Sequence, residues 1–432
     1  MGWDFETDPA FQERLDWVAR FVREEVEPLD HVLGSQWNVH DPDFVRLVRP
    51  LQAIVRREGL WACHLGPELG GQGFGQVKLG LLNEILGRSR FGPVVFGTQA
   101  PDTGNAEILA HFGTPAQKAR WMAPLLENEI VSCFSMTEPQ GGADPLIFTT
   151  SATLDGDEWV ISGEKWFSSN ARFADFLIVM AVTEPDAPPH QRMSMIIVPT
   201  ATPGVEIVRD VGWYGESVHA HAYIRYHDVR VPAGNLLGER GQAFAIAQTR
   251  LGGGRIHHAM RTIGEARKAF DMMAERVLSR VTKGELLADK QMVQEKIADS
   301  WIEIEQFRLL VLRTAWLIDK HNDYRRVRRD IAAVKAAMPK LLHDVAARAL
   351  HLHGSLGLTH EMPFMAQVAT SFMLGLADGP TEVHKVTVAR ETLKAYSATD
   401  ELFPAYHLPR QEAAARARYD MRTIDELVQA DG

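Results

Sequence analysis

The spacing of apolar residues divides the chain into three zones. From about residue 8 to 130, apolar residues recur at helical spacing, as in Phe11, Leu15 and Val18. From about 131 to 238 the period falls to two, and continuous apolar runs at 176–180 and 195–198 are typical of buried strands. From about 242 to 397 the spacing is helical again. The pattern therefore predicts a helical zone, a β zone and a second helical zone, in that order.

Turn and cap residues sharpen this prediction. Asp155-Gly156 is a strong hairpin signal, and the short strands around it suggest a small β-barrel or sandwich. Thr114 before Pro115 favours the start of a helix. The third zone has long stretches without proline, which favour a helical bundle, and residues 411–418 suggest a surface helix. We expect domains at 1–130, 131–240 and 241–400, followed by a tail at 401–432.

Composition narrows the class of protein. The 432 residues carry 46 basic and 56 acidic side chains, a net charge of −10 that disfavours a nucleic-acid partner. Two cysteines, Cys63 and Cys133, are too few for a disulfide framework and suggest a reducing compartment. The longest apolar runs are too short to span a bilayer, and the first residues do not resemble a secretory signal. We expect a cytoplasmic protein without membrane insertion.

Asp378 is the leading candidate for a chemical role. It follows an apolar stretch at 372–376 and precedes Gly379. A glycine lets the chain bend sharply at a helix end, so the carboxylate can turn into a cavity. Taken alone, Asp378-Gly379 also fits an ordinary surface turn.

Two upstream segments favour a chemical role for Asp378 over an ordinary surface turn. The first, at 133–144, contains Thr137-Glu138-Pro139, and the second, at 163–170, contains Gly163-x-Lys165-Trp166. With the segment around Asp378, and in this order and spacing, they resemble the acyl-CoA dehydrogenase family over about residues 8 to 400. The resemblance implies an α+β multi-domain fold, with an N-terminal helical domain, a central β domain and a C-terminal four-helix bundle.

It also implies an activity in lipid metabolism, as in fatty acid β-oxidation. The reaction is FAD-dependent α,β-dehydrogenation of an acyl-CoA thioester to a trans-2-enoyl-CoA, with electrons passed to an electron-transferring flavoprotein. In the family a carboxylate removes the α-proton and flavin N5 accepts the β-hydride. Asp378 occupies the position of this base. Its backbone N–H and the flavin ribityl 2′-hydroxyl are implied to polarise the thioester oxygen.

Asp378 departs from the family pattern, in which the base is usually Glu. The change shortens the reach by one methylene, about 1.5 Å, and a displacement near 1 Å can cost about a hundredfold in rate. The surrounding strings, 377–384 and 250–262, look like a subgroup with an Asp base that includes animal members fused to a kinase-like domain. Two alternatives stay open within the same fold: a 4-hydroxyacyl-CoA substrate, or a nitroalkane-type carbon acid with oxygen as acceptor.

The resemblance also assigns further residues. The implied flavin contacts are Phe134, Met136, Thr137, Trp166, Ser168 and Glu382. The implied contacts to the adenine end of FAD, made across a subunit interface, are Arg280, Gln291, His351 and Gly354. The implied substrate contacts are Ala143, Arg255 and Gly379. A cofactor shared in this way implies a homodimer or homotetramer.

Other readings of the sequence are weaker. The pairs His257-His258 and His351-x-His353 lack the clustered acidic or cysteine ligands of a metal site, so no metal is expected. Gly252-Gly253-Gly254 lacks the Lys-Ser/Thr of a P-loop. A DNA-binding branch of the family would predict a basic C-terminal extension, whereas the tail here has mixed charge.

Overall fold

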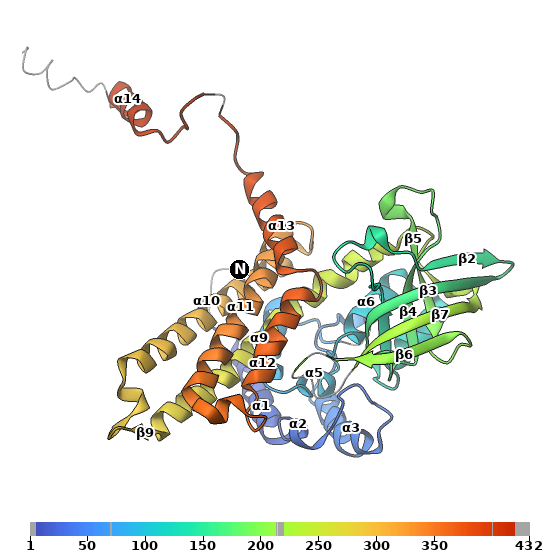
Figure 1. Cartoon of the computed structure of the whole chain (residues 1–432), viewed down its shortest axis with the longest axis horizontal. Helices are drawn as coiled ribbons and strands as arrows, with labels where there is room; N and C mark the ends of the chain where they lie inside the picture. Colours follow the sequence, from blue (N-terminus) through green and yellow to red (C-terminus); the bar gives the residue numbers. More distant parts are fainter. Residues whose placement is uncertain (1–5, 70, 213, 215–219, 400, 420–432) are drawn as a thin grey trace, which may run out of the picture. The chain divides into compact units, whose positions relative to one another are not determined.

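The computed structural model describes residues 6–69, 71–212, 214, 220–399 and 401–419. The chain forms two compact units, Met1–Lys385 and Val386–Gly432 (Figure 1). In the first unit, helices precede and follow a β-sheet, in the order that the apolar spacing predicts.

Short helices form the first zone. Asp8 begins α1 by accepting a hydrogen bond from Phe11 N at 2.9 Å, which satisfies one of the unpaired N–H groups of a helix start. Thr114 and Gln117 form a reciprocal capping box at Pro115, so the predicted Thr114 cap is confirmed. The α-helices are α1 (Pro9–Phe21), α2 (Leu29–Val32), α3 (Pro42–Arg57), α4 (Gly75–Leu86), α5 (Gly92–Val95), α6 (Asp102–Phe112), α7 (Pro115–Gln117) and α8 (Ala123–Leu126).

The middle zone forms one eight-stranded sheet in the order β6-β7-β3-β2-β4-β5-β8, with β1 parallel to β4. The hairpin predicted at Asp155-Gly156 joins β2 to β3, and the two predicted buried strands are β4 and β5. The strands are β1 (Ser132–Ser135), β2 (Ser151–Asp155), β3 (Glu158–Ser169), β4 (Phe176–Val182), β5 (Met193–Pro199), β6 (Val205–Val211), β7 (His221–Pro232) and β8 (Leu236–Leu237).

Long helices make up the third zone. Between α9 and α10 lies a small hairpin of β9 (Val281–Thr282) and β10 (Glu285–Leu286). The helices are α9 (Ala243–Ser279), α10 (Gln291–His321), α11 (Arg328–His353), α12 (Phe364–Leu376) and α13 (Thr381–Leu393). In the second unit, α14 (Leu408–Tyr419) has no buried residue and is exposed over 411–419, as the predicted surface helix at 411–418 requires.

The helical zones are not separate in their packing. Buried side chains of α3 and α4 belong to the same apolar core as those of α9, α10 and α11. A second core lies between the sheet, α6 and the start of α9, so α9 contacts both the bundle and the sheet. Among the described residues, no helix is long and apolar enough to cross a membrane.

Candidate active site

Asp378 lies in the turn between α12 and α13. Its backbone is left-handed, with φ 55°, and Gly379 follows with φ 101°. Its side chain is 21% exposed. The helix end therefore turns at the position that the Asp-Gly pair predicts, and the carboxylate is largely withdrawn from solvent.

Basic side chains from two helices, α9 and α11, lie around this carboxylate. His258 Nε2 on α9 lies 3.8 Å from Asp378 Oδ2. Burial alone would raise the pKa of the carboxyl, but the positive charges of His258, Arg250, Lys335 and Arg255 hold the pKa below its ordinary value. Burial also lowers the pKa of His258 to about 4, so at neutral pH the three other cations keep Asp378 ionised.

Gly254 faces the carboxylate across α9. A Cβ at this position would lie 3.9 Å from Asp378 Oδ2, an ordinary van der Waals distance. The turn can therefore approach this part of α9 without meeting a side chain.

Arg250 connects Asp378 with the first motif. Its guanidinium lies over the Phe134 ring at 4.1 Å, and its Nε donates to Asn105 Oδ1 at 2.8 Å. Asn105 in turn donates to Ser132 Oγ at 2.8 Å. The structure thus brings the start of the first motif, on β1, to the cations around Asp378.

The first and second motifs meet directly. Trp166 N donates to Thr137 O at 2.8 Å. Lys165 Nζ donates to Glu138 Oε1 and to Met136 O, both at 2.8 Å, and the Lys165–Glu138 pair is buried with 0% and 1% of the side chains exposed. Burial alone would raise the pKa of Glu138, but Lys165 and the hydrogen bonds from 149–150 lower it to about 2. This ion pair fixes the two motifs against each other.

The residues predicted to contact flavin differ in their exposure. Phe134, Met136, Thr137 and Trp166 are half-buried, and the Thr137 hydroxyl has no partner within the described part of the chain. Ser168 is fully buried, and its hydroxyl bonds to Ser135 Oγ at 2.9 Å. Half-buried aromatic rings on β1 and β3, with the Thr137 hydroxyl between them in the chain, fit a flat, partly polar ring system such as flavin.

The residues predicted to hold the adenine end of FAD lie elsewhere. Arg280 follows the end of α9, about 39 Å along the helix from Gly254 at the usual rise per residue. Gln291 begins α10, and His351 and Gly354 lie at the end of α11. Figure 1 shows the β9 hairpin at the far end of the bundle from β3. One chain therefore does not bring these residues to Trp166.

Three other predicted residues have clear positions. Ala143 and Glu382 are exposed. Arg255 is half-buried and donates from Nε to the backbone O of Asp378 at 3.1 Å. Of the predicted substrate contacts, Arg255 and Gly379 thus lie at the Asp378 turn, and Ala143 is in the loop after β1.

Sequence reasoning missed several polar residues near this turn. Lys335 is 2% exposed and donates to Leu374 O at the end of α12. Glu107 Oε2 and the Tyr324 hydroxyl lie 3.3 and 3.6 Å from the position of a Cβ on Gly253. Burial raises the pKa of Glu107 to about 7. Arg250 and His258 lie in the segment 250–262 that resembles the subgroup with an Asp base, so the sequence could have indicated them. Glu107, Tyr324 and Lys335 lie in no recognised motif.

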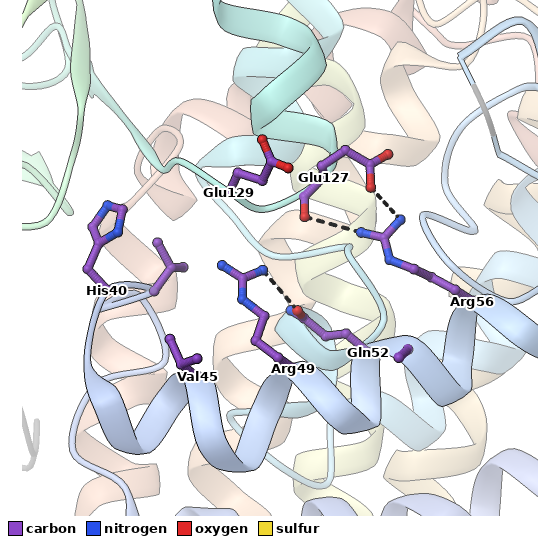
Figure 2. A pocket seen from close by; sticks show the side chains of 9 residues that line it. His40, Val45, Arg49, Gln52, Arg56, Glu127 and Glu129 are labelled. Carbon is purple, nitrogen blue, oxygen red and sulfur yellow. Dashed lines mark hydrogen bonds and ion pairs between the residues drawn. The ribbon is translucent and has the colours of Figure 1, made fainter.

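Two surface pockets lie away from Asp378. One, of about 580 Å³, is on α3 and the segment after α8, and Figure 2 shows that Arg56 bonds there to Glu127 and Arg49 to Gln52. The other, of about 710 Å³, lies at the start of α9. Its lining includes Arg240 and the facing rings of His190 and Phe244, whose centroids are 4.3 Å apart.

Family models cover most of the chain. The acyl-CoA dehydrogenase N-terminal domain matches residues 9–129, the middle domain 133–229 and the C-terminal domain 241–393.

Individual proteins are similar over nearly the whole chain. "Probable acyl-CoA dehydrogenase FadE2" of Mycobacterium tuberculosis is 40% identical, covering 92% of this chain and 94% of its own length. "Acyl-CoA dehydrogenase family member 10" of Mus musculus is 37% identical over 91% of this chain, which spans only 38% of that longer protein. A solved structure from Mycobacterium abscessus, also described under the acyl-CoA dehydrogenase name, is 36% identical with a TM-score of 0.84, covering 91% of this chain and all of that one.

Proposed function

This chain belongs to the acyl-CoA dehydrogenase family of FAD-dependent oxidoreductases, and we propose that Asp378 is its catalytic base. The proposed reaction converts an acyl-CoA thioester to a trans-2-enoyl-CoA. Asp378 takes the proton from the carbon next to the thioester carbonyl. The bound flavin supplies the acceptor for the β-hydride, and an electron-transferring flavoprotein is the proposed next acceptor.

The observation that carries this proposal is the state of the Asp378 carboxylate. It is ionised and mostly buried, and no described residue donates a hydrogen bond to either of its oxygens. Such a group keeps its lone pairs for a substrate proton. Bound substrate would exclude water and disfavour the charged form, which strengthens the base at the moment it acts.

The backbone at the same turn supports polarisation of the thioester. Neither Asp378 N–H nor Gly379 N–H has a hydrogen-bond partner among the described residues. An N–H that stays unpaired at a half-buried turn is available for an oxygen that gains negative charge during proton removal. We assign the thioester oxygen to Asp378 N–H.

The proposed cofactor site spans two chains. Trp166 and Phe134 offer apolar surface to the flavin ring, Thr137 offers a hydroxyl, and Met136 lies beside them. Because the Ser168 hydroxyl bonds inside the sheet, Ser168 contributes through its backbone. We propose that Glu382, four residues after Asp378, also contacts the flavin. The contacts to the adenine end, from the far end of a second copy's bundle, are Arg280, Gln291, His351 and Gly354, so the enzyme is at least a dimer.

The pocket at the start of α9 is the proposed site for the nucleotide end of CoA. The N-terminus of a long helix favours phosphate, Arg240 adds positive charge, and the His190 and Phe244 rings offer stacking to adenine. Ala245 in this pocket is about 14 Å along α9 from Gly254. The pantetheine arm would follow α9 from this pocket to Asp378, passing near Arg255 and Ala143.

A second candidate substrate is a 4-hydroxyacyl-CoA. Glu107 and Tyr324, which have no hydrogen-bond partner among the described residues, lie over Gly253, the residue next to Gly254. His257 Nε2 is also buried without a partner. Polar groups in this state favour a hydroxylated chain over a plain alkyl chain, because burying them against alkyl groups would be costly. Nitroalkane-type carbon acids are a less favoured candidate.

Anaerobic titration of the purified FAD enzyme tests the proposal. Acyl-CoAs of increasing length, branched forms, 4-hydroxy forms and nitroalkanes are added in turn while flavin bleaching is followed. We expect bleaching by one class of acyl-CoA. Bleaching by nitroalkanes alone would overturn the acyl-CoA proposal, and bleaching by the 4-hydroxy forms alone would establish the second candidate.

A further inference from the structure

At the turn between α12 and α13, two side chains hydrogen-bond to the backbone carbonyl of Asp378. Arg255 Nε donates to Asp378 O at 3.1 Å, and His384 Nε2 lies 3.2 Å from the same oxygen. A carbonyl oxygen only accepts, so the proton of His384 is on Nε2. Burial, together with the nearby charge of Arg255, lowers the pKa of His384 to about 4. At neutral pH the imidazole is therefore an uncharged donor.

The turn is built closely around this imidazole. His384 is 5% exposed and lies in the first turn of α13. A Cβ on Gly379 would lie 3.0 Å from His384 Nε2, and the φ of 101° at Gly379 is one that other residues rarely adopt. Glycine at 379 thus lets the imidazole reach over the turn to Asp378 O.

The flanks of the turn are held separately. Lys335 Nζ donates to Leu374 O, and Thr381 Oγ1 donates to Gly375 O at 3.3 Å. These bonds satisfy carbonyls that the end of α12 leaves unpaired. Asp378 itself has a left-handed backbone that is uncommon outside glycine, so its orientation depends on the two donors at its own carbonyl.

We propose that His384 is a positioning residue for the base. With Arg255, its Nε2–H fixes the plane of the peptide that joins Asp378 to Gly379, and so holds the Asp378 Cα from which the carboxylate projects. An Asp has one torsion fewer than Glu with which to correct a displaced backbone, which makes the position of the backbone decisive. This inference rests on the proposed role of Asp378.

A pair of substitutions that differ by one methylene tests it. His384→Gln keeps an N–H donor at nearly the same reach, whereas His384→Asn withdraws it. The readouts are the rate constant of anaerobic flavin reduction at saturating acyl-CoA and the dissociation constant of that acyl-CoA. We expect the Gln variant within about threefold of wild type and the Asn variant about 30-fold slower, as for a sub-ångström displacement of the base, with dissociation constants unchanged. His360→Asn, an exposed histidine of the same unit, is the control.

Asp378→Asn, measured in parallel, separates the possible failures. If Asp378→Asn removes reduction but the Gln and Asn variants of His384 reduce at equal rates, the positioning role is wrong and the base assignment stands. If Asp378→Asn reduces at the wild-type rate, the base assignment itself is wrong. A weakened acyl-CoA affinity in His384→Asn, with an unchanged rate constant, would also overturn the positioning role.

Discussion

Two carboxylates of this chain, Glu138 and Asp378, lie beside cations but use their oxygens differently. Glu138 accepts hydrogen bonds from Lys165 Nζ at 2.8 Å, from Thr149 N at 2.7 Å and from Thr150 N at 2.9 Å. The basic side chain nearest to Asp378 is His258, at 3.8 Å, and the Asp378 oxygens receive no hydrogen bond from any described residue. Both pKa values are lowered, one by direct bonds and the other by cations at a distance.

The difference separates a structural from a functional carboxylate. Every contact of Glu138 would be lost on unfolding, so its ionised form stabilises the fold. Asp378 is held by its backbone while its oxygens stay open, so its ionised form serves a ligand that is not part of the chain. Nearby positive charge alone does not tell the two roles apart, whereas the hydrogen bonds at the oxygens do.

Glu138→Gln is the substitution with the largest expected effect, and it tests whether the Glu138 carboxylate stabilises the fold. It leaves the buried Lys165 amine, whose pKa burial lowers to about 8, without its anionic partner, and we expect a loss of about 3 kcal/mol in the free energy of unfolding at pH 7, the equivalent of the Glu138 pKa shift. The measurement is denaturant unfolding. Because folding lowers the Glu138 pKa from 4.5 to about 2, the difference from wild type should be complete above pH 4.5 and fade as pH falls towards 2.

Replacing both partners gives the control. Glu138→Gln with Lys165→Met removes the buried charge altogether, and such double replacements often recover most of the loss. A single Glu138→Gln variant as stable as wild type would contradict the structural role.

Asp378→Glu lengthens the side chain by one methylene and tests whether the turn is fitted to an Asp base. The longer side chain should overshoot a turn that is fixed for Asp, and a displacement near 1 Å predicts a loss of about a hundredfold in the rate of flavin reduction. Thermal unfolding should not change, since the charge is kept and the carboxylate accepts no hydrogen bond from any described residue. A faster Glu variant would show that the turn is not fitted to the shorter base.

Lys335→Met tests whether cations that form no hydrogen bond with the Asp378 carboxylate lower its pKa. Without this charge the Asp378 pKa should rise, so the acidic limb of the rate-against-pH profile should move to higher pH. Because the Asp378 pKa lies below its ordinary value of 3.8, the loss should appear below about pH 4, where a shift of about one pH unit corresponds to a loss of about tenfold, and we expect little loss at neutral pH. Lys340→Met, an exposed cation on the same helix, is the control and should leave the profile in place. An unmoved acidic limb in Lys335→Met would contradict the electrostatic account.

The smallest effect is expected at an exposed ion pair on the sheet. Arg230 bonds to Asp155 and Glu158, and all three side chains are at least 42% exposed. Such pairs contribute little because water and salt screen them. Arg230→Ala should leave the midpoint of denaturant unfolding within error of wild type. A clear loss would mean that exposure does not separate this pair from Glu138–Lys165.

The sequence anticipated the features that depend on local chemistry. Helical and strand periods, the hairpin at Asp155-Gly156, the Thr114 cap and the turn at Asp378-Gly379 all follow from short stretches of chain. The apolar spacing predicted the order of the zones, the resemblance to the family implied their assembly into one multi-domain fold, and the structure agrees with both.

Features that need long-range packing were not anticipated. Glu138 and Lys165 are both in the motifs, but their pairing depends on β3 meeting the loop after β1. Arg250 and His258 come from α9 and Lys335 from α11, so only the assembled bundle brings them to Asp378. The irregular register between Lys165 and Ser168 accompanies the burial of the Ser168 hydroxyl, which simple strand alternation does not reveal.

Asp378→Asn tests the central claim most directly. The same preparation is used for the rate constant of anaerobic flavin reduction by an acyl-CoA and for the free energy of unfolding. The account predicts a rate lower by about 10²–10⁴-fold, the usual contribution of a positioned base, with bound FAD and a free energy of unfolding close to wild type. Reduction at the wild-type rate, or loss of rate only together with loss of the fold, would contradict it.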